Sequence, residues 1–244
     1  MKSKIIEMKR NGRGKTMFQA LMSGLKKMPD YELITVCILA SILILAIALA
    51  VNNFPGYKSL VTEDGFVEWL TVFSLLGCAL MCFIRAIQLK SKRKKMFIFS
   101  LLLLGIVFFF GMGEEMSWGQ RVFNIESSDF FSVHNTQEEM NIHNLEVMGV
   151  RINKAIFSLF LGVMICFYTF IMPVLYHKFA KFQKLVDKHA IPIPRNYQIV
   201  LYTLLMIVVL LINAPEKWEL LEMVGSVMFL LMVLNPENLE IYKD

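Results

Sequence analysis

The chain has 244 residues, of which 56% are hydrophobic and 18% charged, and its mean hydropathy is +0.56. A soluble globular domain of this length has no use for so much apolar surface, so the composition excludes that class. The formal net charge of +5 comes from 25 Lys and Arg residues against 20 Asp and Glu residues. Because the placement of the basic residues follows membrane topology, we expect no binding to nucleic acid.

Six uninterrupted apolar blocks follow one another along the chain. Each is close to the roughly 17–25 residues that a helix needs to cross a bilayer. Strands of a membrane barrel would alternate in polarity, whereas these blocks do not, so helices are favoured. The sequence predicts an all-α polytopic membrane protein with six transmembrane helices and no separate soluble domain. The predicted spans are 33–51, 66–89, 96–112, 155–175, 197–213 and 218–235.

Residues 1–32 precede the first span and are polar and basic. Apolar residues recur among them at helical spacing with lysines in between, which is typical of a helix lying on an anionic membrane surface. A disordered basic tail is the alternative. The pattern of a cleaved signal is not present. We therefore expect a cytoplasmic amphipathic segment, 1–32, followed by a membrane domain, 33–244.

Basic residues in the short connections predict the orientation. If the N-terminus is cytoplasmic, 20 of the 25 Lys and Arg residues lie on the inner side. This four-to-one bias follows the positive-inside rule and predicts that both termini are cytoplasmic. We expect a multi-pass protein of the bacterial inner (cytoplasmic) membrane.

Carboxylates gather at the opposite, periplasmic boundary. Glu68, Glu115 and Glu222 come from three different spans and lie at similar depth. An ionised carboxylate within an apolar span is costly and usually faces a partner or a cavity. These residues predict one shared polar cavity. The alternative is a set of solvated helix ends.

The segment between the third and fourth spans, 113–153, predicts an outer interfacial or re-entrant cap. Thr136 followed by Glu139 is a capping-box pattern, and we expect a short helix near 137–147. His143 would share one face of that helix with Glu139.

The cap is expected to fold back onto the outer end of the third span. Glu115 or Glu114 would then lie within hydrogen-bonding or one-water distance of His143 or Arg121. Glu68 and Glu222 would face the same cavity.

These residue types suit acid–base chemistry at a lipid boundary. Clustered carboxylates keep a proton available, and histidine exchanges protons near neutral pH. An arginine suits a phosphate or carboxylate headgroup. Candidate catalytic residues are Glu68, Glu114, Glu115, Glu139 and His143. Candidate substrate-binding residues are Trp69, Trp118, Gln120, Arg121, Asn141, Asn144, Glu219 and Glu222.

A divalent metal ion is the cofactor that the same residues could hold, with Glu115, Glu139 and His143 as candidate ligands. The stronger metal patterns HExxH and paired CxxC are not present in the sequence.

The leading hypothesis is a hydrolase or transferase with its polar site at the outer (periplasmic) membrane boundary, acting on a lipid-linked or amphipathic substrate such as a lipid or glycolipid. The alternatives are a proton- or cation-coupled transporter, a channel or a membrane sensor, or a non-catalytic scaffold. Polarity concentrated at one boundary favours the enzyme, because a transporter more often has broken spans with polar residues at the midplane. A homo-oligomer stays open.

Three short segments carry a family resemblance: "EDGFVEW" (63–69), "GEEMSWGQR" (113–121) and "NTQEEMNIHNL" (135–145). Together they resemble a broad group of bacterial multi-span membrane proteins that share the patterns EDGxxEW, GEExSWGQR and NxQxExNxHNL. The resemblance implies that the motif residues belong to one functional unit, and it implies no particular activity. These residues are Glu63, Asp64, Glu68, Trp69, Glu114, Glu115, Ser117, Trp118, Gln120, Arg121, Gln137, Glu139, Asn141, His143 and Asn144.

Overall fold

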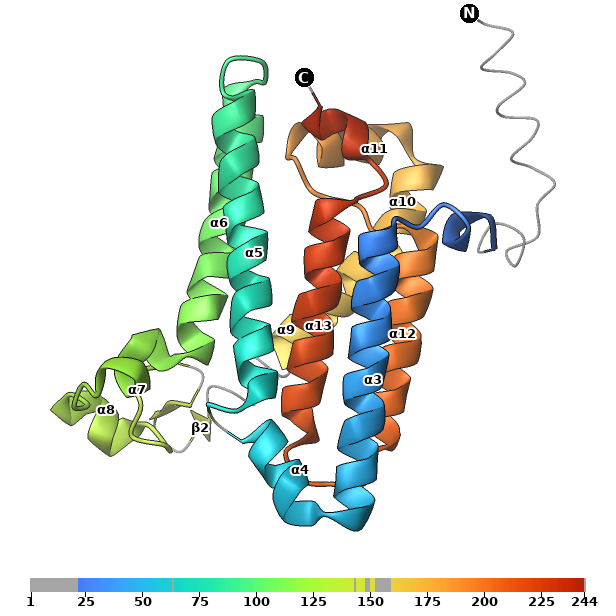
Figure 1. Ribbon diagram of the computed structural model, residues 1–244. Helices are drawn as coiled ribbons and strands as arrows, with labels where there is room; N and C mark the ends of the chain where they lie inside the picture. The colour runs from blue at the N-terminus through green and yellow to red at the C-terminus, as the bar shows by residue number, and fades with distance from the viewer. Residues whose placement is uncertain (1–21, 63, 143, 148–149, 152–158, 244) are drawn as a thin grey trace, which may run out of the picture.

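The computed structural model in Figure 1 is a bundle of long helices with a smaller irregular segment beside one end. It describes residues 22–62, 64–142, 144–147, 150–151 and 159–243. Four stretches are apolar and long enough to cross a membrane, judged by length and composition, and they are compatible with an integral membrane protein. These stretches are Asp30–Asn52, Phe54–Leu89, Lys95–Glu115 and Leu161–Lys178.

The long helices of the bundle are nearly continuous apolar runs, whose backbone groups are paired within each helix. They are α3 (Asp30–Asn52), α5 (Phe66–Leu89), α6 (Lys95–Glu115), α12 (Asn196–Leu211) and α13 (Lys217–Leu234). Helix α13 packs against α5 and α12, and α5 packs against α6. Side chains of α3, α12 and α13 meet in the largest apolar core. Helix α13 is therefore the central element on which the other helices assemble.

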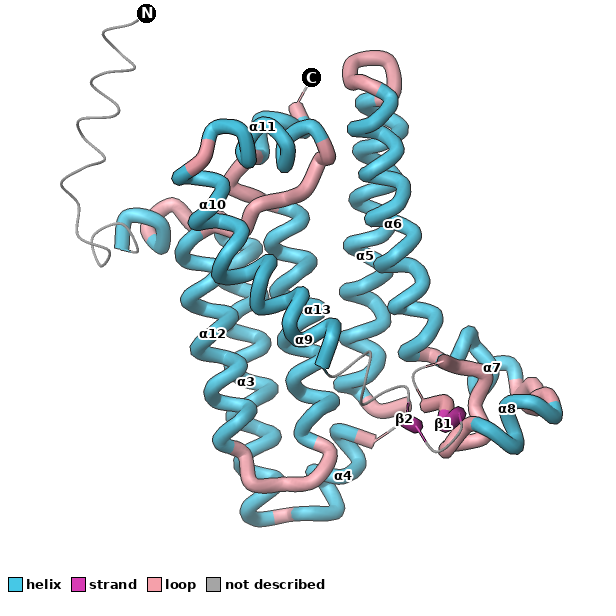
Figure 2. Tube along the Cα trace, turned by 180° about the vertical axis from the view of Figure 1, so that it is seen from behind, coloured by secondary structure: helices cyan, strands magenta, loops and turns pink. Residues whose placement is uncertain are grey.

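A further apolar stretch contains a π-helical turn. It consists of α9 (Leu161–Cys166), the π-helix η3 (Phe167–Ile171) and α10 (Met172–Lys178), and it runs obliquely across the bundle in Figure 2. Pro173 lies in the first turn of α10. Proline lacks the N–H group that would bond to the carbonyl four residues earlier, and the helical ladder widens just before it.

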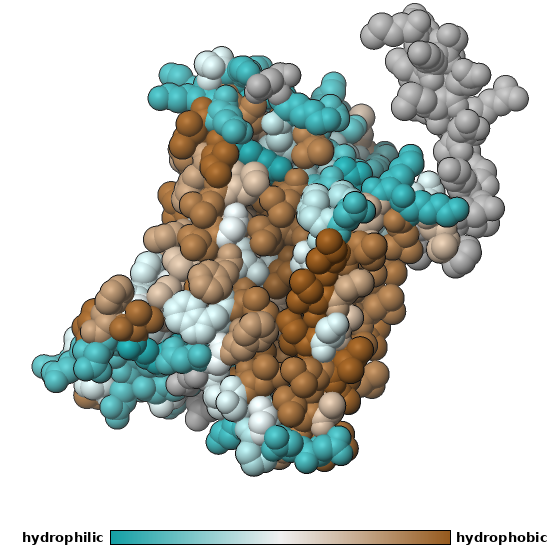
Figure 3. All heavy atoms as spheres, viewed as in Figure 1, coloured by the Kyte–Doolittle hydropathy of each residue, from teal (hydrophilic) through white to brown (hydrophobic). Residues whose placement is uncertain are grey.

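The helices are connected at two opposite ends of the bundle (Figures 1 and 2). One end carries α4 (Phe54–Val61), the turn 212–216 and the segment that follows α6. The other end carries the loop 90–94, α11 (Ala180–Lys188) and η4 (Leu239–Tyr242). Figure 3 shows a hydrophobic belt across the visible face of the bundle, between these two hydrophilic ends. An exposed apolar surface of this extent is typical of contact with lipid.

One carboxylate is buried at the end that carries α11. Glu32, in the first turn of α3, is 1% exposed. Its Oε1 accepts a hydrogen bond from Nδ2 of Asn235 at 2.6 Å, and Nε2 of Gln198 lies 3.4 Å from both of its oxygens. A buried carboxylate is tolerated only when such donors satisfy it. These bonds join α3 to α12 and to the residue that follows α13.

Two arginines hold the C-terminal end of α13. Nη2 of Arg85 donates to the carbonyl oxygen of Leu234 at 3.2 Å, and Nε of Arg195 donates to that of Asn235 at 3.0 Å. The last carbonyls of a helix have no partner within the helix and attract cations. The guanidinium of Arg85 also stacks over the Tyr242 ring, 4.1 Å from its centroid.

The first four predicted spans overlap the four stretches of membrane-crossing length. The other two, 197–213 and 218–235, fall on α12, which has 16 residues, and on α13, which carries acidic side chains near its start. Secondary structure in the described part of the chain is otherwise helical except for two short paired strands. They are β1 (Glu146–Val147) and β2 (Val150–Arg151), in antiparallel register.

The helix predicted near 137–147 is wrong. The described part of this segment is a loop, closed by a bridge between Asn135 and Leu145 and preceded by α8 (Asp129–His134). The hydroxyl of Thr136 donates to the carbonyl oxygen of Asn144 at 3.2 Å, and the carboxylate of Glu139 turns inward to Arg121. The capping box therefore does not form, because a stronger tertiary partner takes its carboxylate.

Close contact between α5 and α6 depends on Gly105, where an added Cβ would lie 2.5 Å from Cε1 of Phe83. We expect Gly105→Val to separate the two helices and to lower the free energy of unfolding by about 1–3 kcal/mol, measured by thermal unfolding in detergent. Gly225→Val is the matched control, since no described atom lies within 4 Å of a Cβ at that position. Equal losses in the two variants would contradict the close approach.

Candidate functional site

The segment that follows α6 folds into an irregular unit, residues 116–142 and 144–147, which we call the cap. Its helical turns are η1 (Ser117–Gly119), α7 (Gln120–Phe123) and α8. In Figure 1 it projects sideways from the end of the bundle, beside the start of α5.

The guanidinium of Arg121 joins the cap to α5 through three carboxylates. Nε of Arg121 lies 3.0 Å from Oδ1 of Asp64, Nη2 pairs with Glu68, and Nη1 pairs with Glu139. The side chains of Glu68 and Glu139 are each 8% exposed. Charge-assisted bonds of this kind are about twice as strong as neutral ones. One cation thus holds together the turn before α5, the first turn of α5 and the cap.

The same contacts set the charge of the arginine. Burial alone would lower the pKa of the Arg121 guanidinium. The hydrogen bond with Glu139, the charge of Glu68 and the hydrogen bond with Asp64 act against burial, and together they raise the pKa above its usual value. Arg121 is therefore positively charged at any pH at which the protein is folded.

Glu139 is surrounded by donors besides Arg121. The hydroxyl of Ser117 donates to its Oε2, and Nδ2 of Asn141 donates to the same oxygen at 2.8 Å. Asn141 also contacts Oγ of Ser117 at 2.8 Å and is fully buried. The buried oxygens of Glu139 are thus satisfied by hydrogen bonds.

Hydrogen bonds of the Asn135 side chain fix the conformation of the loop that contains Glu139. Its Oδ1 accepts hydrogen bonds from the backbone N–H groups of Gln137 (2.9 Å) and Glu139 (3.2 Å). Its Nδ2 donates to the backbone carbonyl and the side-chain oxygen of Asn141, both at 2.9 Å. An asparagine that bonds to nearby backbone in this way replaces a helical ladder by a turn. This turn aims the Glu139 carboxylate at Arg121.

Gln120 fastens the outer part of the loop. Its Oε1 accepts from the backbone N–H of Met140 at 2.6 Å, while its Nε2 donates to Oγ of Ser127 at 2.8 Å. Glu114 does the same at the end of α6, where Oε2 accepts from the N–H of Ile142 at 2.6 Å. Both side chains are buried. They therefore contribute to docking of the cap.

Trp118 folds back over the end of α6. Its Nε1 donates to Oε1 of Glu114 at 2.9 Å, and its ring meets Phe109 and Phe110 edge-on. A Cβ on Gly113 would lie 2.7 Å from the indole, so only glycine allows this position of the ring. The spacing from Gly113 to Trp118 is thus explained by packing and one hydrogen bond.

Backbone strain is concentrated around the same contacts. Ser117 and Trp118 have positive φ values of 46° and 54°, followed by Gly119 at 81°. Asp64 and Glu138 have φ values of 58° and 57°. Non-glycine residues adopt such values at a cost of about 1–3 kcal/mol each, and they cluster at functional sites. The ion pairs of Arg121 and the bonds of Asn135 offset this cost.

Glu115, the last residue of α6, differs from its neighbours. Among the described residues, no hydrogen-bond donor contacts its carboxylate. Its charge interacts with those of Glu219, Glu68 and Glu114, listed in decreasing order of strength, and with that of Arg121. Glu115 is partly buried, and the three neighbouring carboxylates come from α13, α5 and α6. The site therefore contains one carboxylate that no described hydrogen bond engages.

The structure brings together most, but not all, of the candidate residues. Glu222 is exposed on α13 and Glu68 is buried on α5, and the expectation that both face one cavity stays a prediction. His143 and Glu63 lie outside the described residues, although Ile142 and Asn144 on either side of His143 are both bonded within the cap.

The remaining candidates occupy varied positions. Trp69 is partly buried on α5 and contacts Phe73, with 5.6 Å between ring centroids. The amide of Asn144 donates to Oε1 of Gln137. Glu219 is partly buried near Glu115.

The described residues do not include a group of three or more His, Cys, Asp or Glu side chains placed to hold a metal ion. The oxygens of Glu139 are engaged by Arg121, Ser117 and Asn141. Because His143 lies outside the described residues, the metal site formed by Glu115, Glu139 and His143 stays a prediction.

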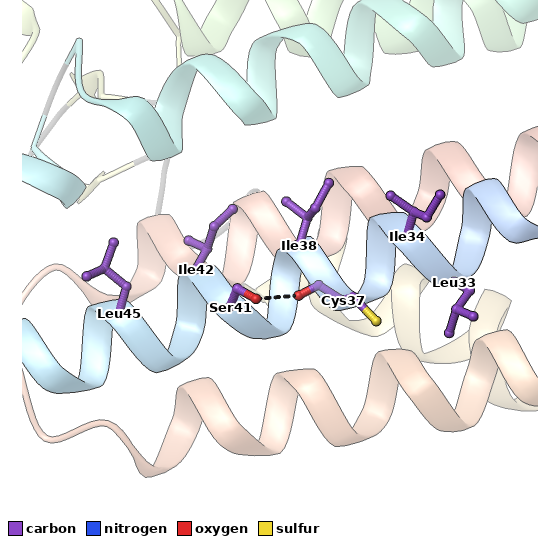
Figure 4. Close-up of a pocket in the computed structure, with 7 residues that line it drawn as sticks. All are labelled: Leu33, Ile34, Cys37, Ile38, Ser41, Ile42 and Leu45. Atoms are coloured by element: carbon purple, nitrogen blue, oxygen red, sulfur yellow. Dashed lines mark hydrogen bonds between the residues drawn. The ribbon is translucent and has the colours of Figure 1, made fainter.

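The apolar groove in Figure 4 lies elsewhere, on one face of α3. Its lining residues are Leu33, Ile34, Cys37, Ile38, Ser41, Ile42 and Leu45. The hydroxyl of Ser41 donates to the carbonyl oxygen of Cys37 at 2.9 Å and is used within the helix. No carboxylate, histidine or basic side chain lines this groove, so it contributes nothing to the chemistry of the site.

No protein-family model, curated protein or solved structure matches this chain. The functional inference therefore rests on the site residues themselves.

Reasoning from residue types missed three members of the site. Asp64 is not among the candidates derived from residue types, yet it pairs with Arg121. Ser117 and Asn135 are neutral and common in turns, and nothing in their own pattern marks them as buried. The available signal was their position inside the motif segments 113–121 and 135–145, since the resemblance already implied Asp64 and Ser117.

Arg121→Ala should undock the cap. It leaves the buried carboxylates of Glu68 and Glu139 without a cation, and breaking a buried pair in this way costs about 3–5 kcal/mol. Arg121→Lys should be intermediate, because an ammonium cannot bridge three carboxylates as a guanidinium does. The measurements are thermal unfolding in detergent and protease cleavage within residues 122–134.

Glu126→Gln is the control for this series, since Glu126 is an exposed carboxylate of the same cap. If Arg121→Ala unfolds at the same temperature as the control and is cleaved by protease at the same rate, the three ion pairs do not hold the cap.

Proposed function

We propose that the chain is a six-span protein of the bacterial cytoplasmic membrane whose outer polar site performs acid–base chemistry on a lipid-linked or amphipathic substrate. The observation that carries the chemistry is Glu115, a carboxylate that no described donor engages, placed among carboxylates of three helices. In this proposal the reaction is a hydrolysis or a group transfer, and Glu115 is the general base.

The topology is supported by the arrangement of the ends. The basic loop 90–94 and α11 lie at the same end of the bundle, and the cap and α4 lie at the other (Figure 1). Lysine and arginine prefer the cytoplasmic side. Tyr57 of α4 donates to the carbonyl oxygen of Pro215 at 3.0 Å, which joins the turn before α13 to the cap end. We therefore propose that α12 and α13 also cross the membrane.

Reporter fusions test this topology. A fusion at residue 92 should give a cytoplasmic signal, and a fusion at residue 130 should give a periplasmic one, because the basic loop is retained inside. A periplasmic signal at residue 92 would refute the orientation and, with it, the outer location of the site.

The roles of the other charged residues follow from their contacts. Glu68 and Glu139 are both paired with Arg121, and Glu114 accepts from Trp118 and Ile142. In the proposal these three are positioning residues that fix the cap and the end of α6. An anionic headgroup at Arg121 would have to displace a carboxylate. We therefore assign Arg121 to positioning as well, instead of to the headgroup clamp expected from the sequence.

Acid–base chemistry suits Glu115 for an electrostatic reason. Repulsion among neighbouring carboxylates favours the uptake of a proton at the cluster, and a group that gains and loses a proton is what general acid–base catalysis requires. A substrate hydroxyl or water molecule next to Glu115 would give up its proton to the carboxylate. His143, whose chain neighbours are bonded at the site, is proposed as the partner that returns a proton to the leaving group.

The apolar middle of the bundle favours an enzyme over a transporter. Buried Cys78 and Cys82 of α5 pack together with apolar neighbours from α6 and α13, among them Leu104 and Phe229. A transported ion needs polar groups at this depth.

Glu115→Gln tests the catalytic role. General acid–base catalysis contributes about 10²–10⁴-fold, and turnover should fall by that factor. Lipid and glycolipid extracts of cells that produce the variant should match extracts of cells without the gene. Glu126→Gln is the control and should match the wild type, and membrane abundance should be equal for all three proteins. If cells that produce Glu115→Gln give the same lipid and glycolipid extracts as cells that produce the wild type, the proposal is rejected.

A second candidate is favoured by the gathering of carboxylates itself, because such a cluster also binds protons or cations. It predicts proton or cation flux in proteoliposomes that Glu115→Gln abolishes, with unchanged lipid extracts. That pair of results would select the transporter.

A further inference from the structure

The cap carries a set of apolar side chains that its own fold leaves exposed. Phe123 at the end of α7 is 72% exposed, and Val133 in α8 is 76% exposed. Val122, Ile125 and Phe130 are also exposed. Other side chains of the same segment are used for docking, as Gln120 and Ser127 bond to the loop that carries Glu138. The cap is therefore amphipathic, with a bonded polar part and an uncovered apolar part.

These apolar side chains gather on one side of the cap. Figure 3 shows hydrophobic residues on the side of the projecting cap that faces the level of the hydrophobic belt, and hydrophilic residues on its opposite side. Figures 1 and 2 agree that α7 and α8 extend sideways beyond α6. The apolar side of the cap thus faces the space next to the surface of α6.

The surface of α6 next to this side of the cap is also apolar and exposed. Phe109 and Phe110 are exposed on α6, and Trp118 packs on them with its ring partly open. The exposed surface of α6 thus continues into the cap through the contacts of Trp118 with Phe109 and Phe110. An apolar patch of this kind marks a protein or membrane partner, and continuity with the belt selects the membrane. Tryptophan at its edge is typical of the lipid–water boundary.

We propose that the cap is an interfacial platform, inserted with its apolar side into the outer leaflet at the boundary of headgroups and acyl chains. Helices with one apolar face bind at this depth, with the polar face in water. The surface formed by Trp118, Phe109 and the cap would then receive the acyl or prenyl chain of an amphipathic molecule beside Glu114 and Glu115. This last step rests on the proposed function, whereas insertion of the platform does not.

Spin labels measure the depth of the platform in proteoliposomes of phosphatidylethanolamine and phosphatidylglycerol. Cys37 and Cys166 are exposed and are first replaced by alanine, while Cys78 and Cys82 are buried and stay. Labels are then placed by Phe123→Cys and Ile125→Cys. Val107→Cys on exposed α6 is the lipid reference, and Glu126→Cys is the aqueous reference. The ratio of relaxation by oxygen to relaxation by a water-soluble nickel chelate reports the depth of each label.

Labels at 123 and 125 should resemble the Val107 reference, with a ratio several-fold above that of the Glu126 reference. Two positions are used so that a variant that fails to insert does not decide the result. If both labels relax like the Glu126 reference, the apolar side lies in water and is open to a protein partner or a second copy, and the proposal is rejected. Since the measurement involves neither Glu115 nor turnover, this failure would leave the proposed function intact.

Discussion

The cap end of this molecule depends on one guanidinium. Arg121 pairs with Asp64, Glu68 and Glu139, which come from three parts of the chain that share no secondary structure. Glu68 and Glu139 alone would each be expensive to bury, and the arginine alone would be too, whereas Asp64 is half exposed. Together they form a polar unit that the apolar bundle tolerates, and the strained turns at Ser117 and Trp118 persist because this unit holds them.

The sequence reveals the helices better than it reveals the site. Apolar blocks are long-range, redundant signals, and several substitutions would be needed to erase one. The role of Glu139, by contrast, depends on where Arg121 lies in space, while its local pattern with Thr136 is equally that of a helix start. Asn135 illustrates the same limit, because a turn-forming asparagine looks alike whether it is solvated or buried. Motif resemblance groups such residues without saying which of them touch.

The two ends of the bundle solve the burial of polar groups by different means. At the cap end, charge meets charge around Arg121, and Glu115 is left without a described hydrogen-bond donor. At the other end, amide groups of Asn235 and Gln198 surround Glu32, while Arg85 and Arg195 bond to backbone carbonyls at the end of α13. The second arrangement satisfies its groups and ties helices together. The first leaves the Glu115 carboxylate without a hydrogen-bond donor among the described residues, so the two ends differ in how completely their polar groups are paired.

The pairing of Glu68 with Arg121 also constrains the order in which the chain can assemble during synthesis. The two residues are 53 positions apart, which corresponds to roughly 3–10 s at about 5–20 residues per second. During the later part of that interval α5, which ends at Leu89, is complete, while Arg121 has not yet been synthesised. Docking of the cap on the start of α5 therefore cannot precede the synthesis of α6, which lies between the two partners in the chain.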